Sequence, residues 1–494
     1  MKTNEYIAPQ ISLFNAKVND ERLIEQNEAV TEKVFNYINS ALVEKEIIAE
    51  LEEVKFYFNV TQYVYKLVSF DGFTFDLDDA LQKIANEARE INGDSCVSGF
   101  VDINSKGKCL LFTVWHFNRR RLQFYKVAQK GGFDGVVSLY CTPEGEPHYE
   151  QLDSFYLTTI ASLGNQADYL LKSILANLVY NYSPKLLKLI VFDGKEDFNE
   201  FNGIPHAIFK ETIHDFNLFY PVIDWLETEV NKRRKLFEES KISNLTAYNK
   251  KNEQKLPYIV LAVNSFMAVF KEYGVYSAKL IKRLTELLDK AQDTGITFLF
   301  SAQTVMHDPY DPSIRARATN AICFAMNTAT DAYNAIGHAL RIGDMLTDKD
   351  GVMVKQGTKL IEMLPCFITP KELNNLVSYL KTQPGEVYEE AYKAICVNAE
   401  SGAMGRRTRI LGEDEFICKE YLRYLILHGK SGEIVQNMNA FLRVDSSIGD
   451  PILERLLQKG YISKHEKNIF TRTVVRYKPL ITAEQFKEIF GEEI

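Results

Sequence analysis

The sequence lacks the features that define several broad classes of protein. It holds seven cysteines in 494 residues, with no Cys-x-x-Cys pair and no regular spacing, and its eight histidines are scattered. We therefore expect neither a disulfide framework nor a metal site. No apolar run approaches the roughly 18–20 residues that a membrane-spanning helix requires, and the first residues lack the apolar core of a signal peptide. These absences favour a cytoplasmic protein without a membrane-embedded part.

An excess of positive charge is also lacking. The chain has 58 lysines and arginines against 66 aspartates and glutamates, a net charge of -8. This balance argues against a surface that is basic all over, but it leaves room for local basic patches. Hydrophobic residues make up 46% of the chain, which is enough for real cores. The length indicates two to four domains.

The pattern of apolar residues divides the chain into four parts. Residues 1–125 mix helical and strand-like spacing, which predicts a small α+β domain. Residues 126–383 alternate short apolar strands with amphipathic helices, which predicts an α/β core with a parallel sheet covered on both faces. Residues 384–412 have the composition of a linker. Residues 413–482 read as three helices followed by a β-hairpin, the pattern of a winged helix.

Some elements can be placed more closely. In the first part we expect helices at 21–41 and 77–91, the second capped by Asp76, and strands at 54–70 and 108–122. The strands expected in the core are 155–161, 187–193, 258–263, 297–303 and 320–326. The helices expected between them include 168–180, 216–239 and 277–292.

One strand–turn–helix segment has the frame of a phosphate-binding loop. In "FYLTTIASLGNQADYLLKSILANL", residues 155–178, a β-type run is followed by the turn signal Gly164-Asn165 and by a helical pattern that starts after Asp168. Ligands of such α/β sheets bind beyond the carboxyl ends of the strands. The loop is therefore expected at the edge of the sheet where a ligand would lie.

The order of short motifs resembles the soluble motor region of the FtsK/SpoIIIE family of DNA translocases. The resemblance runs from "YIAPQISLFN" near the start to the end of the predicted winged helix. It rests on the loop segment, "LIVFDGK" with Asp193 and Lys195, "NGIPH" at 202–206, "NKRRKLFEESKISNLTAYN", "PYIVLAVNSF", "FLFSAQ" and "IGDML" at 342–346.

The resemblance implies a fold and an activity. It implies a RecA-like P-loop NTPase core between the α+β domain and the winged helix. It also implies a hexameric ring around double-stranded DNA, driven by ATP and Mg²⁺. Many full-length members carry transmembrane helices before this region; because this chain starts at the motor region, anchoring at the septum is not expected.

The chemistry expected in the phosphate loop is missing. Such loops need glycines so that backbone N–H groups converge on phosphate, a lysine to neutralise charge, and a Ser/Thr hydroxyl for Mg²⁺. Here Gly164 remains, Ala167 takes the lysine position and Asp168 takes the hydroxyl position. A carboxylate about 4 Å from a phosphate oxygen costs about 4 kcal/mol at an effective dielectric constant near 20. We expect Asp168 instead to cap the free N–H groups of its helix and to meet the helix dipole favourably.

The Walker B strand departs in the same way. It should end in Asp-Glu, but here Asn264 and Ser265 follow Val263. Asn264 can accept a hydrogen bond from a Mg²⁺-bound water but carries no charge, and Ser265 cannot act as a base at neutral pH. Gln303 keeps the sensor position, although a glutamine there could equally satisfy a buried backbone group.

The resemblance also implies arginines that act on a neighbouring subunit, and these are replaced. Ala321 and Tyr333 stand where the family has arginines, although Arg315 and Arg317 lie nearby and could substitute. The joint loss of these catalytic elements favours a pseudo-ATPase over a merely divergent enzyme.

The predicted winged helix lacks the side chains that read bases. The recognition helix carries Ser447, Ile448 and Pro451, and guanine readout needs arginine or lysine. Pro451 is expected in the first turn of this helix. Candidate phosphate contacts for non-specific binding are Arg443, Arg455, Lys459, Lys464, Arg472 and Arg476. A solvated surface or a protein-binding winged helix remains an equal alternative.

Three functional hypotheses follow. The leading one is a translocase homologue that forms a ring, or a mixed ring with an active paralogue, and binds double-stranded DNA or a partner without hydrolysing ATP alone. This hypothesis requires no cofactor. The second is an active, divergent translocase that uses ATP and Mg²⁺. The third is a scaffold or adaptor of a mobile element. The basic runs at 118–121 and 231–235 read as charged faces, with DNA contact by the first left open, and His206 reads as structural.

Overall fold

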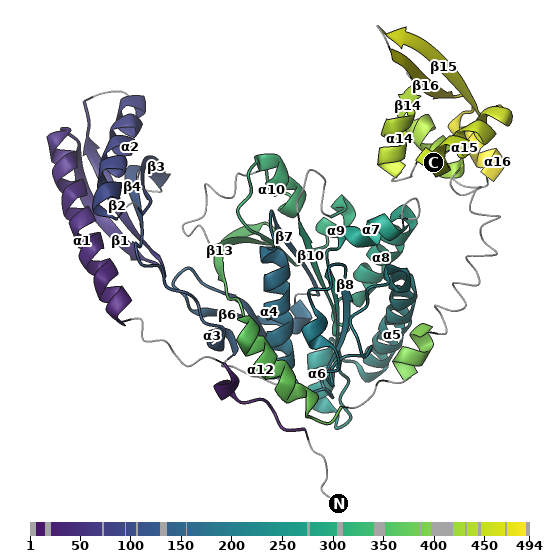
Figure 1. Ribbon diagram of the computed structural model, residues 1–494, viewed down its shortest axis with the longest axis horizontal. Coiled ribbons are helices and arrows are strands. Elements are labelled where there is room, and N and C mark those ends of the chain that lie inside the picture. The colour runs from purple at the N-terminus through teal and green to yellow at the C-terminus, as the bar shows by residue number, and fades with distance from the viewer. Residues whose placement is uncertain are drawn as a thin grey trace, which may run out of the picture.

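The computed structural model contains three β-sheets, each built from a separate part of the chain (Figure 1). It describes residues 6–14, 21–71, 74–93, 95–104, 107–128, 136–154, 156–273, 277–303, 310–339, 351–385, 388, 390–396, 418–429, 432–442, 446–469 and 472–490. None of the helices in these ranges is long and apolar enough to cross a membrane.

The N-terminal part is an antiparallel sheet covered by two helices. Its elements are α1 (Glu21–Glu44), β1 (Ile48–Phe56), β2 (Val60–Ser69), α2 (Thr74–Ile91), β3 (Val97–Asn104) and β4 (Gly107–Trp115). The strand order is β1-β2-β4-β3. Buried side chains of both helices, including Ile38 and Leu81, pack on the sheet. The expected strand at 54–70 is in fact a hairpin, β1–β2, and β3 was not predicted.

The capping role expected for Asp76 is wrong. Asp76 lies inside α2, which begins at Thr74, so its side chain is in the first turn rather than before it. A carboxylate there still meets the positive end of the helix dipole.

The central part is a nine-stranded mixed sheet. The strand order is β6-β5-β13-β12-β11-β7-β10-β9-β8. Its strands are β5 (Val136–Cys141), β6 (Pro147–Gln151), β7 (Leu157–Ser162), β8 (Leu187–Asp193), β9 (Tyr258–Asn264), β10 (Ile296–Gln303), β11 (Asn320–Cys323), β12 (Val352–Gln356) and β13 (Lys359–Pro365). The five strands from β11 to β8 are parallel, and the remaining pairings are antiparallel.

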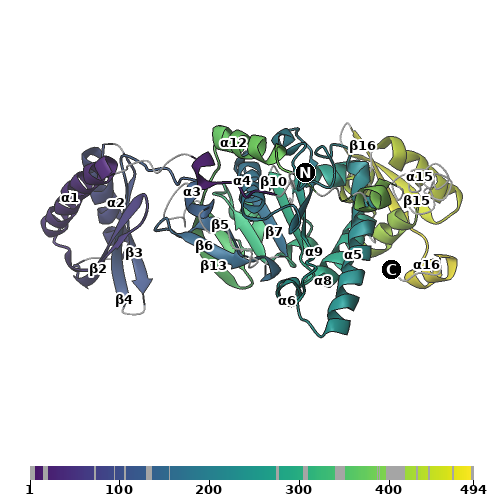
Figure 2. The ribbon, with the colours of Figure 1, turned by 90° about the horizontal axis from the view of Figure 1, so that it is seen from below.

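Helices cover both faces of this sheet (Figure 2). They are α3 (Tyr125–Ala128), α4 (Gln166–Asn181), α5 (Phe219–Ser240), α6 (Leu245–Lys251), α7 (Met267–Tyr273), α8 (Ser277–Ala291), α9 (Pro312–Arg315), α10 (Ala329–Ile336) and α12 (Pro370–Lys381). Alternate residues of β8 serve the two faces. Leu189 packs with α4 and α12, and Ile190 packs with α5 and α8. Burial on both faces explains why this strand reads as a continuous apolar run.

The predicted α/β core is confirmed. Across the sheet, the parallel strands follow the order β11-β7-β10-β9-β8. The strand β7, which carries the candidate loop, therefore lies between β11 and β10. The finer RecA-like assignment, which the resemblance implied, stays a prediction. The antiparallel strands β5, β6, β12 and β13 were not predicted and extend the sheet on the β11 side.

Within the span predicted as linker, residues 390–396 are helical. Ala391 and Ile395 from this helix are buried in the cluster that covers the α5 face of the central sheet. The segment "ESGAMGRR" lies outside the described residues.

The C-terminal part holds a helix at 418–428, α14 (Val435–Leu442), α15 (Ser446–Gln458), α16 (Ala483–Phe490) and the sheet β14-β16-β15. Strands β14 (Glu433–Ile434), β15 (Ile462–Ile469) and β16 (Arg472–Pro479) pair antiparallel. The winged-helix assignment stays a prediction. The placement of Pro451 in the first turn is wrong, because α15 begins at Ser446 and Pro451 is its sixth residue. A proline there removes one intrahelical hydrogen bond.

Candidate functional site

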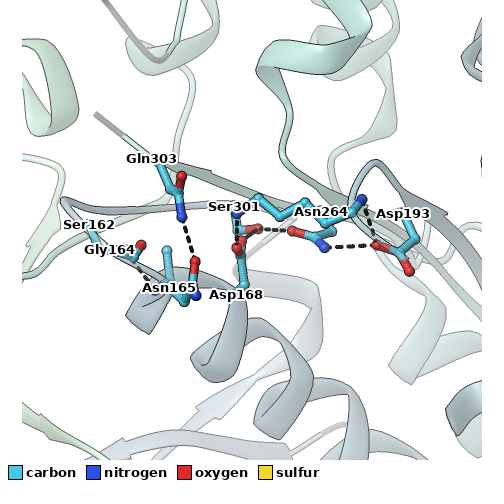
Figure 3. A network of polar contacts seen from close by, with 10 residues as sticks. Ser162, Gly164, Asn165, Asp168, Asp193, Asn264, Ser301 and Gln303 are labelled. Carbon is cyan, nitrogen blue, oxygen red and sulfur yellow. Dashed lines mark hydrogen bonds and ion pairs between the residues drawn. The ribbon is translucent and has the colours of Figure 1, made fainter. Parts of the chain in front are cut away.

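The candidate loop joins β7 to α4 and is closed by its own serine. Ser162, the last residue of β7, is fully buried; its Oγ accepts a hydrogen bond from the Ala167 N–H at 2.9 Å and donates to the Gly164 carbonyl at 2.6 Å (Figure 3). Thus one of the first N–H groups of α4, which in a phosphate loop would face the ligand, is already bound by the chain itself.

The turn at Gly164 does not require the backbone freedom of a glycine. Its φ is not in the left-handed region, and a Cβ there would come closest to the end of the flexible Gln166 side chain, at 2.8 Å. The turn therefore does not depend on a glycine, unlike a loop whose backbone must curl around phosphate.

Asp168 forms the centre of the site. The residue is 2% exposed, and its Oδ2 lies 2.5 Å from the Nζ of Lys195. The hydroxyl of Ser301, on β10, donates to Oδ1 at 2.6 Å. The expectation that Asp168 caps its helix is wrong: α4 already begins at Gln166, so Asp168 is in the first turn and its carboxylate binds groups from other strands.

Lys195 supplies the positive charge that the loop itself lacks. It follows β8, the outermost parallel strand, and its side chain is 28% exposed. Its backbone N–H donates to Asp193 Oδ1 at 3.2 Å, which fixes the turn that aims the side chain at α4. The sequence reasoning missed this contact, although a lysine just beyond the end of a strand at the ligand edge was a usable signal.

The Walker B position is buried and bonded to the neighbouring strand. Asn264, at the end of β9, pairs in register with Asp193 at the end of β8, and its Nδ2 donates to Asp193 Oδ1 at 2.9 Å (Figure 3). Ser301 Oγ is 3.4 Å from Asn264 Oδ1. Because the hydroxyl has a single proton and its contact with Asp168 is shorter, Asn264 is the weaker acceptor.

A carboxylate therefore exists beside the Walker B position, on a different strand from the one expected. Asp193 is fully buried, and its Oδ2 accepts from the Phe198 N–H at 2.8 Å. With the bonds from Asn264 and Lys195 already described, this carboxylate holds the turn after β8 together.

Two residues of the site have backbone in the left-handed region. Ser265, in the catalytic-base position, has φ 57°, and Glu196, next to Lys195, has φ 61°. Such backbone is unfavourable for non-glycine residues and is often concentrated at functional sites. Ser265 sits in the turn that follows β9, where the next N–H, from Phe266, donates to the Ser301 carbonyl at 2.8 Å.

Gln303 ends β10 at the same edge of the sheet. Its Nε2 donates to the Oδ1 of Asn165 at 2.6 Å, so it binds a side chain of the loop rather than a backbone group (Figure 3). The loop is thereby tied to β10 as well as to β8.

Similarity to known proteins bears on this arrangement. Residues 169–358 match the model of the FtsK/SpoIIIE family. This part of the chain is an FtsK/SpoIIIE domain. The DNA translocase FtsK of Caldanaerobacter subterraneus is 24% identical over 318 residues, which cover 63% of this chain and 42% of that protein. The DNA translocase FtsK of Clostridium acetobutylicum is 24% identical over 322 residues, 62% of this chain and 40% of that one. The chain thus spans about two fifths of the length of these relatives.

Some solved structures are also similar to this chain, at lower sequence identity. The pCW3 conjugation coupling protein TcpA has a TM-score of 0.48 at 13% identity, covering 70% of this chain and 99% of that one. EssC from Geobacillus thermodenitrificans has a TM-score of 0.42 at 18% identity, covering 51% of each chain.

The contacts at the start of α4, just before the matched residues, bear on whether a nucleotide phosphate could lie there. A phosphate placed at the start of α4 would meet the Asp168 carboxylate, an ammonium already paired with it, and an N–H already bound by Ser162. The neutral Asn264 adds no charge to hold Mg²⁺. Within the described ranges, no three His, Cys, Asp or Glu side chains gather in a way that would hold a metal ion.

The two substitute arginines make intramolecular contacts. Arg315 is 8% exposed, donates to the Asn334 carbonyl at 2.6 Å and lies over the ring of Tyr333. Arg317 binds Asp289 through two hydrogen bonds of 2.6 and 2.8 Å. Both guanidinium groups therefore bind residues of their own chain in this structure.

The basic runs and His206 have structural contacts. In the first run, the Arg120 guanidinium stacks 4.3 Å from the centroid of Phe58. In the second, Arg233 is 1% exposed and pairs with Glu229. His206 is fully buried, with Nε2 2.7 Å from the Tyr182 carbonyl oxygen. Burial lowers the pKa of His206 to about 4, so the ring is neutral near pH 7.

Four of the six C-terminal candidates for phosphate contact have side chains within the described part of the chain. Arg455, Lys459, Lys464 and Arg476 are exposed. Lys464 pairs with Glu466 at 2.8 Å, and Arg476 donates to the Gly432 carbonyl at 3.3 Å. Arg443 and the side chain of Arg472 lie outside the described part of the chain.

Proposed function

We propose that this chain is a translocase homologue that has kept the motor architecture and closed its nucleotide site. In this account it is a cytoplasmic pseudo-ATPase that forms a ring, or a mixed ring with an active paralogue, and binds double-stranded DNA or a protein partner without hydrolysing ATP alone. The proposal rests on one observation: the 2.5 Å ion pair between Lys195 and Asp168 in the first turn of the loop helix.

The ion pair supports closure more strongly than missing residues do. A lost contact only weakens binding, whereas Asp168 adds a buried negative charge where phosphate would lie. Asp168 also neutralises the Lys195 ammonium, which would otherwise be available to a phosphate at the start of α4. A ligand would have to displace Lys195 from Asp168. Among the described residues, the carboxylate would then keep the Ser301 hydroxyl as its side-chain partner, which is costly for a group that is 2% exposed.

An active, divergent translocase is the second candidate, and the same region supplies its support. Lys195 and Asp193 bring an ammonium and a carboxylate to the ligand edge from β8, so the types of group that ATP hydrolysis needs are present at other positions. If Lys195 left Asp168, it could bind phosphate from the side. ATP and Mg²⁺ would be cofactors only in this case.

Nucleotide binding separates the two candidates. The purified chain would be titrated with a fluorescent ATP analogue and Mg²⁺, and phosphate release would be measured with and without double-stranded DNA. The pseudo-ATPase account predicts neither binding nor hydrolysis. Saturable binding and DNA-stimulated hydrolysis that disappear in Lys195→Met would establish the divergent enzyme instead.

Restoring the family residues step by step tests which positions control nucleotide binding and which control hydrolysis. Ala167→Lys with Asp168→Ser frees the loop and is expected to restore nucleotide binding without hydrolysis. Hydrolysis should return only when Asn264→Asp and Ser265→Glu are added, because the attacking water needs a base. Turnover by the first pair alone would contradict this account. The matched control is Ala167→Lys alone, in which Asp168 still faces any phosphate.

Binding to DNA is the separable half of the proposal. The name shared by the curated relatives, DNA translocase, and the exposed cations of the C-terminal part support it. A scaffold or adaptor that uses the fold without DNA is the remaining alternative. Absence of binding to duplex DNA at low salt would leave protein partners, and the nucleotide measurements would be unaffected by that result.

A further inference from the structure

A groove lies between α1 and the edge strand of the N-terminal sheet, far along the chain from the nucleotide site. Its volume is about 620 Å³. It is lined by the apolar side chains Ile24, Phe35, Leu51, Val54, Phe56, Tyr57 and Tyr63. β1 is the outermost strand of its sheet, so one side of the groove opens along a strand edge.

The groove exposes apolar surface that a solitary domain would be expected to bury. Phe56 is 72% exposed and Leu51 is 43% exposed. An irregularity in the pairing of β1 with β2, between Leu51 and Glu53, brings Leu51 and Val54 to the same groove although they are three residues apart. Exposed apolar clusters on an edge strand are typical of surfaces that bind another chain.

The elements that form the groove are strongly acidic. α1 carries five glutamates against Arg22 and Lys33, and β1 carries three against Lys55. Glu28 and Glu32 are exposed and line the groove itself. The occupant that fits is therefore a basic segment with apolar side chains.

The cationic side chains of the groove do not cancel this charge. Arg120 is stacked on Phe58 and donates to the Phe58 carbonyl. Burial, aided by the nearby Arg120, lowers the pKa of His116 to about 4, so its ring is neutral near pH 7. The groove thus has two exposed carboxylates, of Glu28 and Glu32, and one guanidinium, of Arg120, which is stacked on Phe58.

We propose that this groove binds residues 404–411, MGRRTRIL, of a second copy of the chain. This segment lies outside the described residues; it has three arginines, no acidic residue, and the apolar side chains of Met404, Ile410 and Leu411. Another copy's sheet edge fits the groove less well, because β3 carries Asp102 and no lysine or arginine. Like charges would then face each other at the strand edge.

The neighbouring copy is a better donor of the segment than the same chain. The chain leaves the central part at 390–396, which packs on the face of the sheet that α5 covers. Figure 1 shows α5 and the N-terminal sheet on opposite sides of the central sheet. A groove on one copy and a segment on the next make a head-to-tail contact, which closes into a ring when the rotation allows. This inference does not depend on whether the nucleotide site is closed.

The test uses a fluorescent peptide of residues 401–412 and the full chain. The receptor chain carries Arg406→Glu, Arg407→Glu and Arg409→Glu, so that its own segment does not compete. We expect saturable binding that weakens as salt rises. Glu28→Lys with Glu32→Lys in the receptor should lower the affinity at least tenfold, because two attractive charges become repulsive. A peptide with the three arginines changed to glutamate should bind the receptor with Glu28→Lys and Glu32→Lys better than it binds the receptor that keeps both glutamates.

Control variants separate recognition from net charge and from unfolding. Asp79→Lys with Glu90→Lys changes the charge by the same amount on exposed positions of α2 and should leave peptide affinity unchanged. Phe56→Ala removes an exposed ring, should leave the thermal unfolding of the chain unchanged and should weaken the peptide several-fold. Failure of the peptide to bind, or equal effects of the groove and control reversals, would overturn the proposal, as would an unchanged affinity in Phe56→Ala.

Discussion

Lys195, just beyond β8, and Asp168, in the first turn of α4, form an ion pair across the carboxyl edge of the central sheet. The pair stands where the resemblance places a lysine and a hydroxyl within one loop. The two charges come from helix α4 and from the turn after β8, and they neutralise each other within the chain. In the function we propose, these side chains close the nucleotide site.

The two halves of this pair should not be equivalent for stability. Lys195→Met removes the ion pair of the Asp168 carboxylate, which is 2% exposed and keeps its hydrogen bond from Ser301. This change should cost about 3 kcal/mol. Asp168→Asn leaves an ammonium whose side chain is 28% exposed and can turn to water, so the cost should be about 1 kcal/mol. Hydrogen exchange of the α4 amides in increasing urea measures both locally. The double variant Lys195→Met with Asp168→Asn should regain most of the stability that Lys195→Met loses. Equal losses of stability in the two single variants would show that Asp168 is not the more buried partner of the pair.

His206 should make stability depend on pH. Its pKa is lowered to about 4 in the folded chain and is about 6.5 when unfolded, so the unfolded chain binds more protons between these values. Stability is therefore fully present above about pH 6.5 and is lost as the pH falls towards 4. His206→Gln can still donate to the Tyr182 carbonyl but cannot titrate. Urea unfolding at pH 7 and pH 5 should show a smaller loss in this variant than in the parent; an identical loss would mean that His206 does not carry the effect.

Non-specific binding of duplex DNA should depend on α15. Arg455→Ala and Lys459→Ala should each weaken binding and reduce the slope of log affinity against log salt by about 1, as expected for a lost phosphate contact. Lys235→Ala, an exposed lysine of α5, is the matched control and should leave the slope unchanged. An equal change in the control would show that only the overall charge matters.

The parts of the fold that the sequence predicted well are those buried on both faces. β8 and β9 were predicted almost to the residue, because a strand between two helical layers is apolar throughout. β1 was missed in large part because it is an exposed edge strand whose side chains alternate little in burial. The start of α15 was misplaced because Pro451 was taken as a first-turn signal, whereas the helix runs through it.

The candidate site was predictable in position but not in its contacts. Asn264 and Gln303 lie at the ends of their strands, at the edge where the sequence placed them. The partners of Asp168 were missed, because Lys195 is 27 residues away along the chain and Ser301 is 133 residues away. Spacing along a helix or strand cannot reveal such contacts; they follow from the order of strands in the sheet.

The most direct test of a closed site is calorimetric titration of the intact chain with ATP and Mg²⁺, repeated with Asp168→Ser. The account predicts no heat of binding for the parent chain and measurable binding for the variant, since Lys195 is then free to meet phosphate. Tight binding by the parent, or binding that Asp168→Ser leaves unchanged, would contradict it.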